Sequence, residues 1–532
     1  MTGQTRYVLA WTSAWGVGIA ALLLVSVHFA EGHLVYSLDD PYIHLAVAEN
    51  ILGGGYGINA EGYSSPASSL LYPILLAPTI ALGWGTFGAI VINLLAVGLS
   101  VSLLLGFFWR NAIQDNENPG AILFANMMAP LLILSISGFA LPMTGMEHSL
   151  HVLAVIVTIR GLVAVAEGGK VPPSLAVAVA AMPFIRFEGA ALAIASIFVL
   201  IATRHLRAAV LIGTIIIVGF AAHVFVMQRL GLPPLPSSVL LKSSLAGNVH
   251  TLEARGFLVA LKRHLVESMD NRWGILLALG ACAILATAKG RNGRWLSLES
   301  PGSLIGAAMV FGLGAHIAAG QYGWFGRYEV YAVTILVVGG IYLLRPLWPT
   351  ICSMRLLPAQ IGLLAALLLV FAPYAKTAWR TPRACRNIYE QQFQMHRFVT
   401  EFFPRGVAIN DLGWVSYGND SYVLDLWGLG SETVRLARAS GRLDAEAIAD
   451  LAEEADVDFA MIYASWFEGK IPESWCLMAT LLLIDSMTAG GDEVQFYATR
   501  ASAQADMSTA LDRFAPTLPA RVQLERTTCP RP

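Results

Sequence analysis

The sequence predicts a multi-pass α-helical membrane protein of about eleven spans, followed by a C-terminal soluble α/β domain. First, 56% of the 532 residues are hydrophobic and only 13% are charged, whereas about a quarter is typical of soluble domains. Second, apolar runs long enough for membrane helices recur over residues 1–375. Third, the chain from Thr381 onward carries 13 Lys or Arg and 21 Asp or Glu, whereas the remainder carries 21 and 15. A less apolar, acidic tail after a basic membrane region indicates a separate soluble domain.

The first apolar run is expected to be a retained helix rather than a signal peptide, because it has no clear small-residue cleavage site and further spans follow. The run over 173–203 is interrupted by Pro183, Arg186 and Glu188. We interpret it as two short helices, and a single kinked span is the alternative. The expected spans lie near 9–29, 87–109, 121–140, 149–166, 173–186, 188–203, 207–227, 272–288, 302–319, 328–345 and 356–373.

Basic residues in the short loops predict the orientation. Arg110, Lys170 and Arg204 lie on alternate loops, which are then cytoplasmic. This parity requires that residues 67–83, which contain two prolines, form an interfacial or re-entrant element within an outward loop over 37–83. We therefore expect a protein of the plasma (inner) membrane whose candidate site faces the periplasmic or extracellular side.

The two expected domains are a membrane domain over 1–375 and an outward-facing soluble domain over 376–532. Within the latter, short strands are expected at 407–411, 422–426 and 458–465, and a helix at 444–455. No glycine fingerprint for a dinucleotide follows any of these strands. An exported location permits one disulfide in this region, and the sequence does not choose the pair among Cys385, Cys476 and Cys529.

The densest polar stretch runs from Ser37 to Pro66 and contains two adjacent carboxylates, Asp39 and Asp40. A carboxylate at the edge of a bilayer can deprotonate a hydroxyl group or hold a divalent cation against a phosphate. Repulsion between adjacent carboxylates raises the pKa of one, which favours a general base. The alternative is that the pair caps the helix that follows. We interpret the pair as functional, because other ionisable residues also lie at membrane depth.

Those other ionisable residues include Glu147, Arg186 and Glu188. Such groups are costly at membrane depth and tend to be paired or functional, so Arg186 is expected to pair with Glu188 or Glu147. A purely structural ion pair is the alternative. Lys242 and Arg327 are suited to neutralise a phosphate at the outer interface, and each fits an ordinary interface cation equally well.

Aromatic and polar residues suited to sugar binding occur in the same outward segments. The cluster around Tyr322 and Trp324 fits a membrane-interface belt or stacking on a sugar. The histidines show no metal-ligand spacing. The expected acceptor- or sugar-binding residues are His44, Tyr63, Tyr322, Trp324, Asp411 and Trp414.

Four motifs, LDDPYIHLAVAENILGGGYGIN…EGYSSP, TGMEHSL, RFEG and GRYEVYAV, occur in this order along the chain. Together they resemble the GT-C superfamily of polyprenyl-phosphate-sugar-dependent glycosyltransferases. The likeness is greatest to the mycobacterial terminal arabinofuranosyltransferases, and more distant to lipid A aminoarabinose transferases and protein mannosyltransferases. The tail segment VAINDLGWVSYGNDSYVLDLWGLGS looks like the soluble domain of that family. The chain departs from the family at RFEG, which replaces Arg-Pro-Glu-Gly, and around Lys242, where the aromatic-rich family pattern is missing.

The resemblance implies a GT-C-like enzyme that moves a sugar, such as arabinofuranose, from a polyprenyl-phosphate donor to a cell-envelope glycan or lipid, with inversion. Asp39 would be the general base, with Asp40 as its partner and Glu147 as a second carboxylate. The tail would hold the growing glycan. No cofactor is firmly expected; a divalent cation, Mg²⁺ or Mn²⁺, is compatible with Asp40. The donor phosphate would be held by the site formed by Arg186, Glu188, Lys242 and Arg327.

A transporter or flippase of a lipid-linked glycan is the alternative class, because it too needs charges at membrane depth. Transporters often show internal repeats and charges near the midplane. Here no repeat is visible, and the charges cluster at the outward ends of the expected spans. No basic, aromatic-interleaved patch indicates nucleic acid. The expected partners are therefore a lipid-linked sugar donor, a glycan or lipid acceptor, and membrane lipids.

Overall fold

The computed structural model describes residues 1–115, 118–242, 254–287, 300–353 and 357–527. The chain forms two compact units. The first comprises Met1–Leu22, Ile90–Ala222 and Asn248–Arg380. The second comprises Leu23–Ala89, His223–Gly247 and Thr381–Pro532. The segment after the first apolar helix therefore belongs to the same compact unit as the C-terminal segment, more than 290 residues further along the chain.

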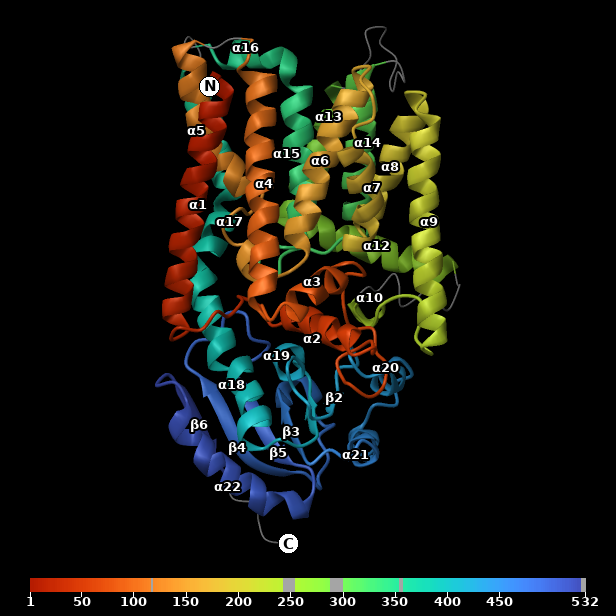
Figure 1. Cartoon of the computed structure of the whole chain (residues 1–532), viewed down its shortest axis with the longest axis vertical. Coiled ribbons are helices and arrows are strands. Elements are labelled where there is room, and N and C mark those ends of the chain that lie inside the picture. The colour runs from red at the N-terminus through yellow and green to blue at the C-terminus, as the bar shows by residue number, and fades with distance from the viewer. Residues whose placement is uncertain (116–117, 243–253, 288–299, 354–356, 528–532) are drawn as a thin grey trace. The chain divides into compact units, whose positions relative to one another are not determined.

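The first unit is helical, and its helices α6, α14 and α15 lie side by side (Figure 1). The long apolar helices that contribute to it are α1 (Gly3–Phe29), α4 (Phe87–Ala112), α6 (His148–Ala166), α9 (Leu206–Arg229), α14 (Pro301–Ala319) and α17 (Leu357–Glu390). The remaining helices are α5 (Pro119–Ser135), α7 (Pro173–Ile185), α8 (Gly189–Ala202), α12 (Ala254–Asp270), α13 (Arg272–Thr287), α15 (Val330–Leu343) and α16 (Trp348–Ile351).

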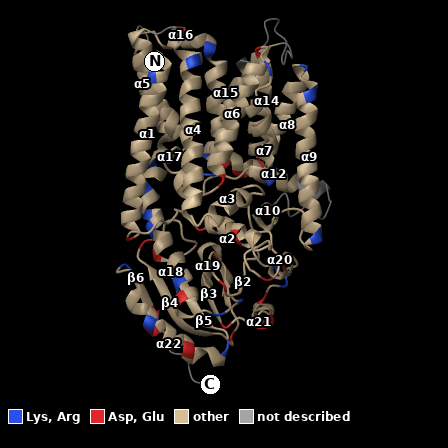
Figure 2. Cartoon of the chain, viewed as in Figure 1, with Lys and Arg blue, Asp and Glu red and all other residues tan. Residues whose placement is uncertain are grey.

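Each segment expected to span the membrane contains an α-helix over most of the length that the structure describes. In the described part of the chain, six helices are long and apolar enough to cross a membrane, and counting two bent pairs as one span each gives eight. The charged residues of α1, α4 and α9 lie near the helix ends (Figure 2). A multi-pass membrane protein is confirmed, while the number of eleven spans and the orientation stay predictions.

The interrupted run over 173–203 forms two helices, as expected. Helix α7 ends at Ile185, where Arg186 takes an extended conformation with φ −149° and ψ 136°. Helix α8 begins at Gly189, and a Cβ on this glycine would lie 2.5 Å from the Met182 side chain. The break therefore results from a local backbone turn that presents Arg186 and Glu188 between two helices.

The second unit contains a six-stranded mixed sheet with the order β2-β1-β3-β5-β4-β6. Strands β2, β1 and β3 are parallel, and the other neighbours are antiparallel. The three strands expected from the sequence are β1, β2 and β3, and the expected helix is α21 (Ala445–Glu454). The strands are β1 (Val407–Ile409), β2 (Val423–Asp425), β3 (Phe459–Ile462), β4 (Cys476–Leu483), β5 (Glu493–Ala498) and β6 (Val522–Arg526).

Alternate residues of the strands point to opposite faces of this sheet. Each face packs into its own buried core. Val407 and Phe459 join a core that includes residues of α2 (Asp40–Leu52) and α22 (Gln504–Phe514). Ala408 and Ala460 join the opposite core, together with residues of α20 (Glu432–Ala439) and α21. The α/β character expected for the tail is therefore confirmed (Figure 1).

Short elements complete the second unit. Helix α3 (Tyr72–Ala81) has 10 residues, which is too few to cross a bilayer. The others are α10 (Ser237–Lys242), α18 (Gln392–Arg397) and α19 (Gly413–Ser416). Cys385 is a buried free thiol and Cys476 is disulfide-bonded. Cys529 lies outside the described residues.

Candidate functional site

Asp39 lies at the N-terminus of α2, yet its side chain makes no capping hydrogen bond to that helix. Its carboxylate instead accepts hydrogen bonds from two backbone N–H groups of the C-terminal segment. Oδ2 lies 2.6 Å from the nitrogen of Gly413 and Oδ1 lies 2.9 Å from that of Trp414. Only 7% of the residue is exposed. The helix-cap interpretation is therefore wrong for α2, and Asp39 binds the start of α19 instead.

A second carboxyl group, that of Asp411, lies beside Asp39. Asp411 is close enough for its charge to act on Asp39, and its Oδ2 accepts from Gln392 Nε2 at 2.7 Å and from the Tyr463 hydroxyl at 2.9 Å. Burial and the neighbouring Asp411 charge raise the pKa of Asp39 well above its usual value, and burial raises the pKa of Asp411. Burial and the nearby negative charge therefore make both carboxyl groups hold a proton more firmly than an isolated carboxylate does.

The position of Asp411 follows from the topology of the sheet. It comes two residues after the end of β1, and β1 lies between β2 and β3 in the parallel part of the sheet. From β1 the chain continues into β2 on one side of β1, and it later returns as β3 on the other side. The carboxyl end of such a strand is where α/β sheets characteristically bind ligands. Asp39, whose carboxylate neighbours Asp411, thus lies near the carboxyl end of β1.

Trp414 and Asp40 flank this pair. The Trp414 ring stacks on Tyr42, with centroids 4.0 Å apart and an interplanar angle of 28°. Asp40 is the first residue of α2 and is half-buried. Of the predicted residues, the structure therefore brings Asp39 into contact with Trp414 and near Asp411, with Asp40 next in the chain.

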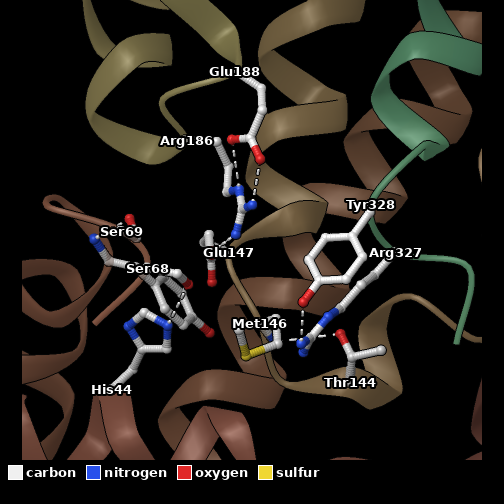
Figure 3. A network of polar contacts seen from close by, with 11 residues as sticks. His44, Ser68, Ser69, Thr144, Met146, Glu147, Arg186, Glu188, Arg327 and Tyr328 are labelled. Carbon is white, nitrogen blue, oxygen red and sulfur yellow. Dashed lines mark hydrogen bonds and ion pairs between the residues drawn. The ribbon is translucent and has the colours of Figure 1, made fainter. Parts of the chain in front are cut away.

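In the first unit, Arg186 connects Glu147 and Glu188 (Figure 3). Its Nη1 lies 2.9 Å from Glu147 Oε1, and its Nη2 lies 2.6 Å from Glu188 Oε1. Arg186 therefore pairs with both glutamates. Since Glu147 is fully buried, removing the arginine would leave a buried negative charge. Glu147 and Arg186 are buried in this cluster, whereas the Glu188 side chain is 27% exposed.

A second buried guanidinium, that of Arg327, belongs to the same unit. It is 1% exposed and donates to the Tyr328 hydroxyl at 3.0 Å (Figure 3). The Tyr328 ring contacts both arginines, with its centroid 4.9 Å from the Arg327 guanidinium carbon and 5.8 Å from that of Arg186. Two arginines expected to bind a phosphate are therefore gathered around one tyrosine.

The remaining predicted residues lie in different settings. His44 is buried in α2, where its Nε2 lies 3.3 Å from Ser68 Oγ. Tyr63 is 49% exposed. Tyr322 packs edge-on against His316, whereas Trp324 is exposed and has a positive φ of 45°. Lys242 is the last residue of α10, and its side chain lies outside the described part.

Several residues at the Asp39 site carried no recognisable signal in the sequence. Gln392 and Tyr463 hold Asp411, and Asn59 binds the backbone of β2. Asn59 and its partner are 364 residues apart. A single polar residue in a glycine-rich loop is typical of a turn. Nothing in the sequence near Asn59 indicates a partner as distant as Val423.

Comparisons with known proteins give few matches. A sequence family described as a domain of unknown function (DUF8728) matches residues 386–497, which include β1 to β5. No curated protein matches the chain. Two crystal structures of the Archaeoglobus fulgidus oligosaccharyltransferase are similar to it. One, tethered with an acceptor peptide containing the NVT sequon via a disulfide bond, has a TM-score of 0.42 and 12% identity over 97% of this chain and 76% of that one. The other, a complex with Zn and sulfate, has a TM-score of 0.44 and 11% identity over 96% and 74%. These values leave the assignment of function to the residues of the chain itself.

Proposed function

We propose that the chain is an integral-membrane glycosyltransferase of the GT-C type. It transfers a sugar from a polyprenyl-phosphate donor to a cell-envelope glycan or lipid, with inversion at the anomeric carbon, and a pentofuranose such as arabinofuranose is the proposed sugar. The four sequence motifs and the set of apolar helices support this class. The observation that carries the proposal is the buried pair of Asp39 and Asp411, because it provides a proton acceptor in the first motif.

In this proposal Asp39 is the general base. The acceptor hydroxyl oxygen bonds to the anomeric carbon, the bond from that carbon to the phosphate oxygen breaks, and the hydroxyl proton moves to Asp39. A carboxylate whose pKa is raised holds that proton more firmly, which suits a base.

The leaving group is a polyprenyl phosphate, which departs with increased negative charge. Cations fixed beforehand stabilise such charge at little cost in reorganisation. Arg186 and Arg327 are the proposed donor-phosphate residues, since both are buried and contact the same tyrosine. The glutamates around Arg186 hold its guanidinium in place.

The test is transfer by the purified full-length protein in detergent. It would be given a panel of polyprenyl-phosphate sugars, pentofuranoses included, and a short glycan or lipid acceptor. The proposal predicts a glycosylated acceptor together with free polyprenyl phosphate. A protein that binds a donor and leaves its sugar–phosphate bond intact across the panel would instead be a transporter of lipid-linked sugars.

A further inference from the structure

The polar stretch around Asp39 binds the C-terminal segment at three points about ten residues apart. Asp39 accepts from the backbone of Gly413 and Trp414, as described above. Glu49 Oε2 accepts from the N–H of Gly418 at 2.9 Å. Asn59 binds Val423 through both ends of its amide. All these contacts lie within the second unit, and each uses a side chain of 37–66 and a backbone group of 413–423.

The Asn59 contact is specific in chemistry. Among the residues that the structure describes, strand β2 is at the edge of the sheet and pairs only with β1. Asn59 Nδ2 donates to the Val423 carbonyl at 2.9 Å, and Asn59 Oδ1 accepts from the Val423 N–H at 2.8 Å. The side chain thus substitutes for the backbone of a further strand and satisfies an edge that is otherwise open. Aspartate lacks the donor and alanine lacks both groups, so asparagine is the residue that fits.

Apolar packing reinforces the polar contacts. Ile43, Ala46 and Ile58 belong to the same buried cluster as strands β1 and β3. A Cβ on Gly430 would lie 2.4 Å from Ile58. The 37–66 stretch therefore contributes to the core of the sheet and does not merely touch its surface.

The closest approach is at Gly413. A Cβ at this position would lie 2.0 Å from the backbone oxygen of Asp39 and 2.5 Å from its carboxyl carbon. Any residue other than glycine at position 413 would clash with Asp39, so only glycine lets the α19 backbone reach the Asp39 carboxylate at this distance.

We propose that Asn59, Glu49 and Gly413 are positioning residues, which hold the Asp39 carboxylate in one orientation by tying its loop to the C-terminal segment. The catalytic part of this inference rests on the function proposed above. In this inference the C-terminal segment contributes to catalysis by positioning the base, in addition to the glycan binding that is expected of it. A displacement of about 1 Å at a reacting group can cost on the order of 100-fold in rate, so a loose loop should lower kcat.

The structural part is tested by hydrogen–deuterium exchange on the full-length protein in detergent. Asn59→Ala should speed exchange at least tenfold in peptides covering 413–423, because the Val423 N–H loses its acceptor and the loop loosens. Glu61→Ala is the matched control, since Glu61 is an exposed residue of the same loop. Exchange in Asn59→Ala equal to that in the control would overturn the proposal.

The catalytic part is tested by kinetics on the same variants. Asn59→Ala should lower kcat about tenfold or more while the KM for the donor changes less than twofold, and Glu61→Ala should match the wild type. Asn59→Asp keeps the acceptor for the Val423 N–H, so it should recover part of the exchange protection and part of kcat. A loosened Asn59→Ala variant with wild-type kcat would refute positioning while leaving the proposed transferase intact. A wild-type protein that transfers nothing would refute the transferase, while the exchange result still decides whether Asn59 holds the two segments together.

Discussion

Trp414 shows how a residue next to the candidate site is held. Its ring lies between Tyr42, Phe393 and His396, and the His396 ring centroid is 5.3 Å away. Burial lowers the pKa of His396 to about 4, so the folded protein keeps this imidazole neutral. The aromatic cluster around Trp414 therefore depends on an uncharged histidine.

This neutrality predicts a pH dependence of stability. Because the folded-state pKa of His396 lies below its ordinary value, its contribution is complete above about pH 6.5 and is lost as the pH falls through about 4. The loss is at most about 3 kcal/mol. Between pH 7 and 4.5, the melting temperature should fall less for His396→Phe than for the wild type, as measured by tryptophan fluorescence. Nearby carboxyl groups titrate in both proteins, so equal losses would show that His396 does not contribute.

At the scale of elements, local patterns predicted the helices and the parallel strands. Long apolar runs mark α4 and α9, and short continuous apolar runs mark β1 and β3, because each pattern depends only on near neighbours in the chain. The partner of Asp39 was not predictable in this way. The contact with Gly413 spans 374 residues and uses a backbone N–H, which every residue except proline offers.

Helix α12 was also missed, because charged residues interrupt its apolar pattern. It meets α13 at an angle of 95°. Its exposed apolar residues occupy one arc of about 120° at 100° per residue, with Lys262 inside that arc. An apolar arc beside charged residues, on a helix perpendicular to an apolar one, is typical of a membrane interface. The residues of the arc are Leu258, Val259, Leu265, Val266 and Met269.

We therefore expect α12 to lie in the membrane–water interface. The test uses protein reconstituted in vesicles, with a fluorophore on Leu265→Cys and lipids brominated near the headgroup. Quenching should be strong at this position and weak at Glu446→Cys, an exposed position on α21 that serves as the control. Equal, weak quenching at both positions would contradict an interfacial α12.

At the scale of the whole molecule, the compact units are not continuous in sequence, because Leu23–Ala89 form one unit with Thr381–Pro532. The boundary near residue 376 between a membrane domain and a soluble domain stays a prediction. Composition reveals where a chain becomes polar, whereas compact units depend on contacts such as that of Asn59 with Val423. The polar density of 37–66 thus has two sources, the candidate base and the side chains that bind the C-terminal segment.

In the proposed function, Asp39 is the general base of a sugar transfer. The most direct measurement compares transfer by the wild type, Asp39→Asn and Asp40→Asn in detergent, with the donor that the panel identifies. Hydrogen–deuterium exchange over β3 to β5, which do not contact Asp39 through their backbone, would establish that each variant keeps its fold. Asp39→Asn should lose on the order of 100-fold or more in kcat, because the amide cannot take the proton. Asp40→Asn should retain more activity than Asp39→Asn. Full transfer by a well-folded Asp39→Asn protein would show that Asp39 is not the general base.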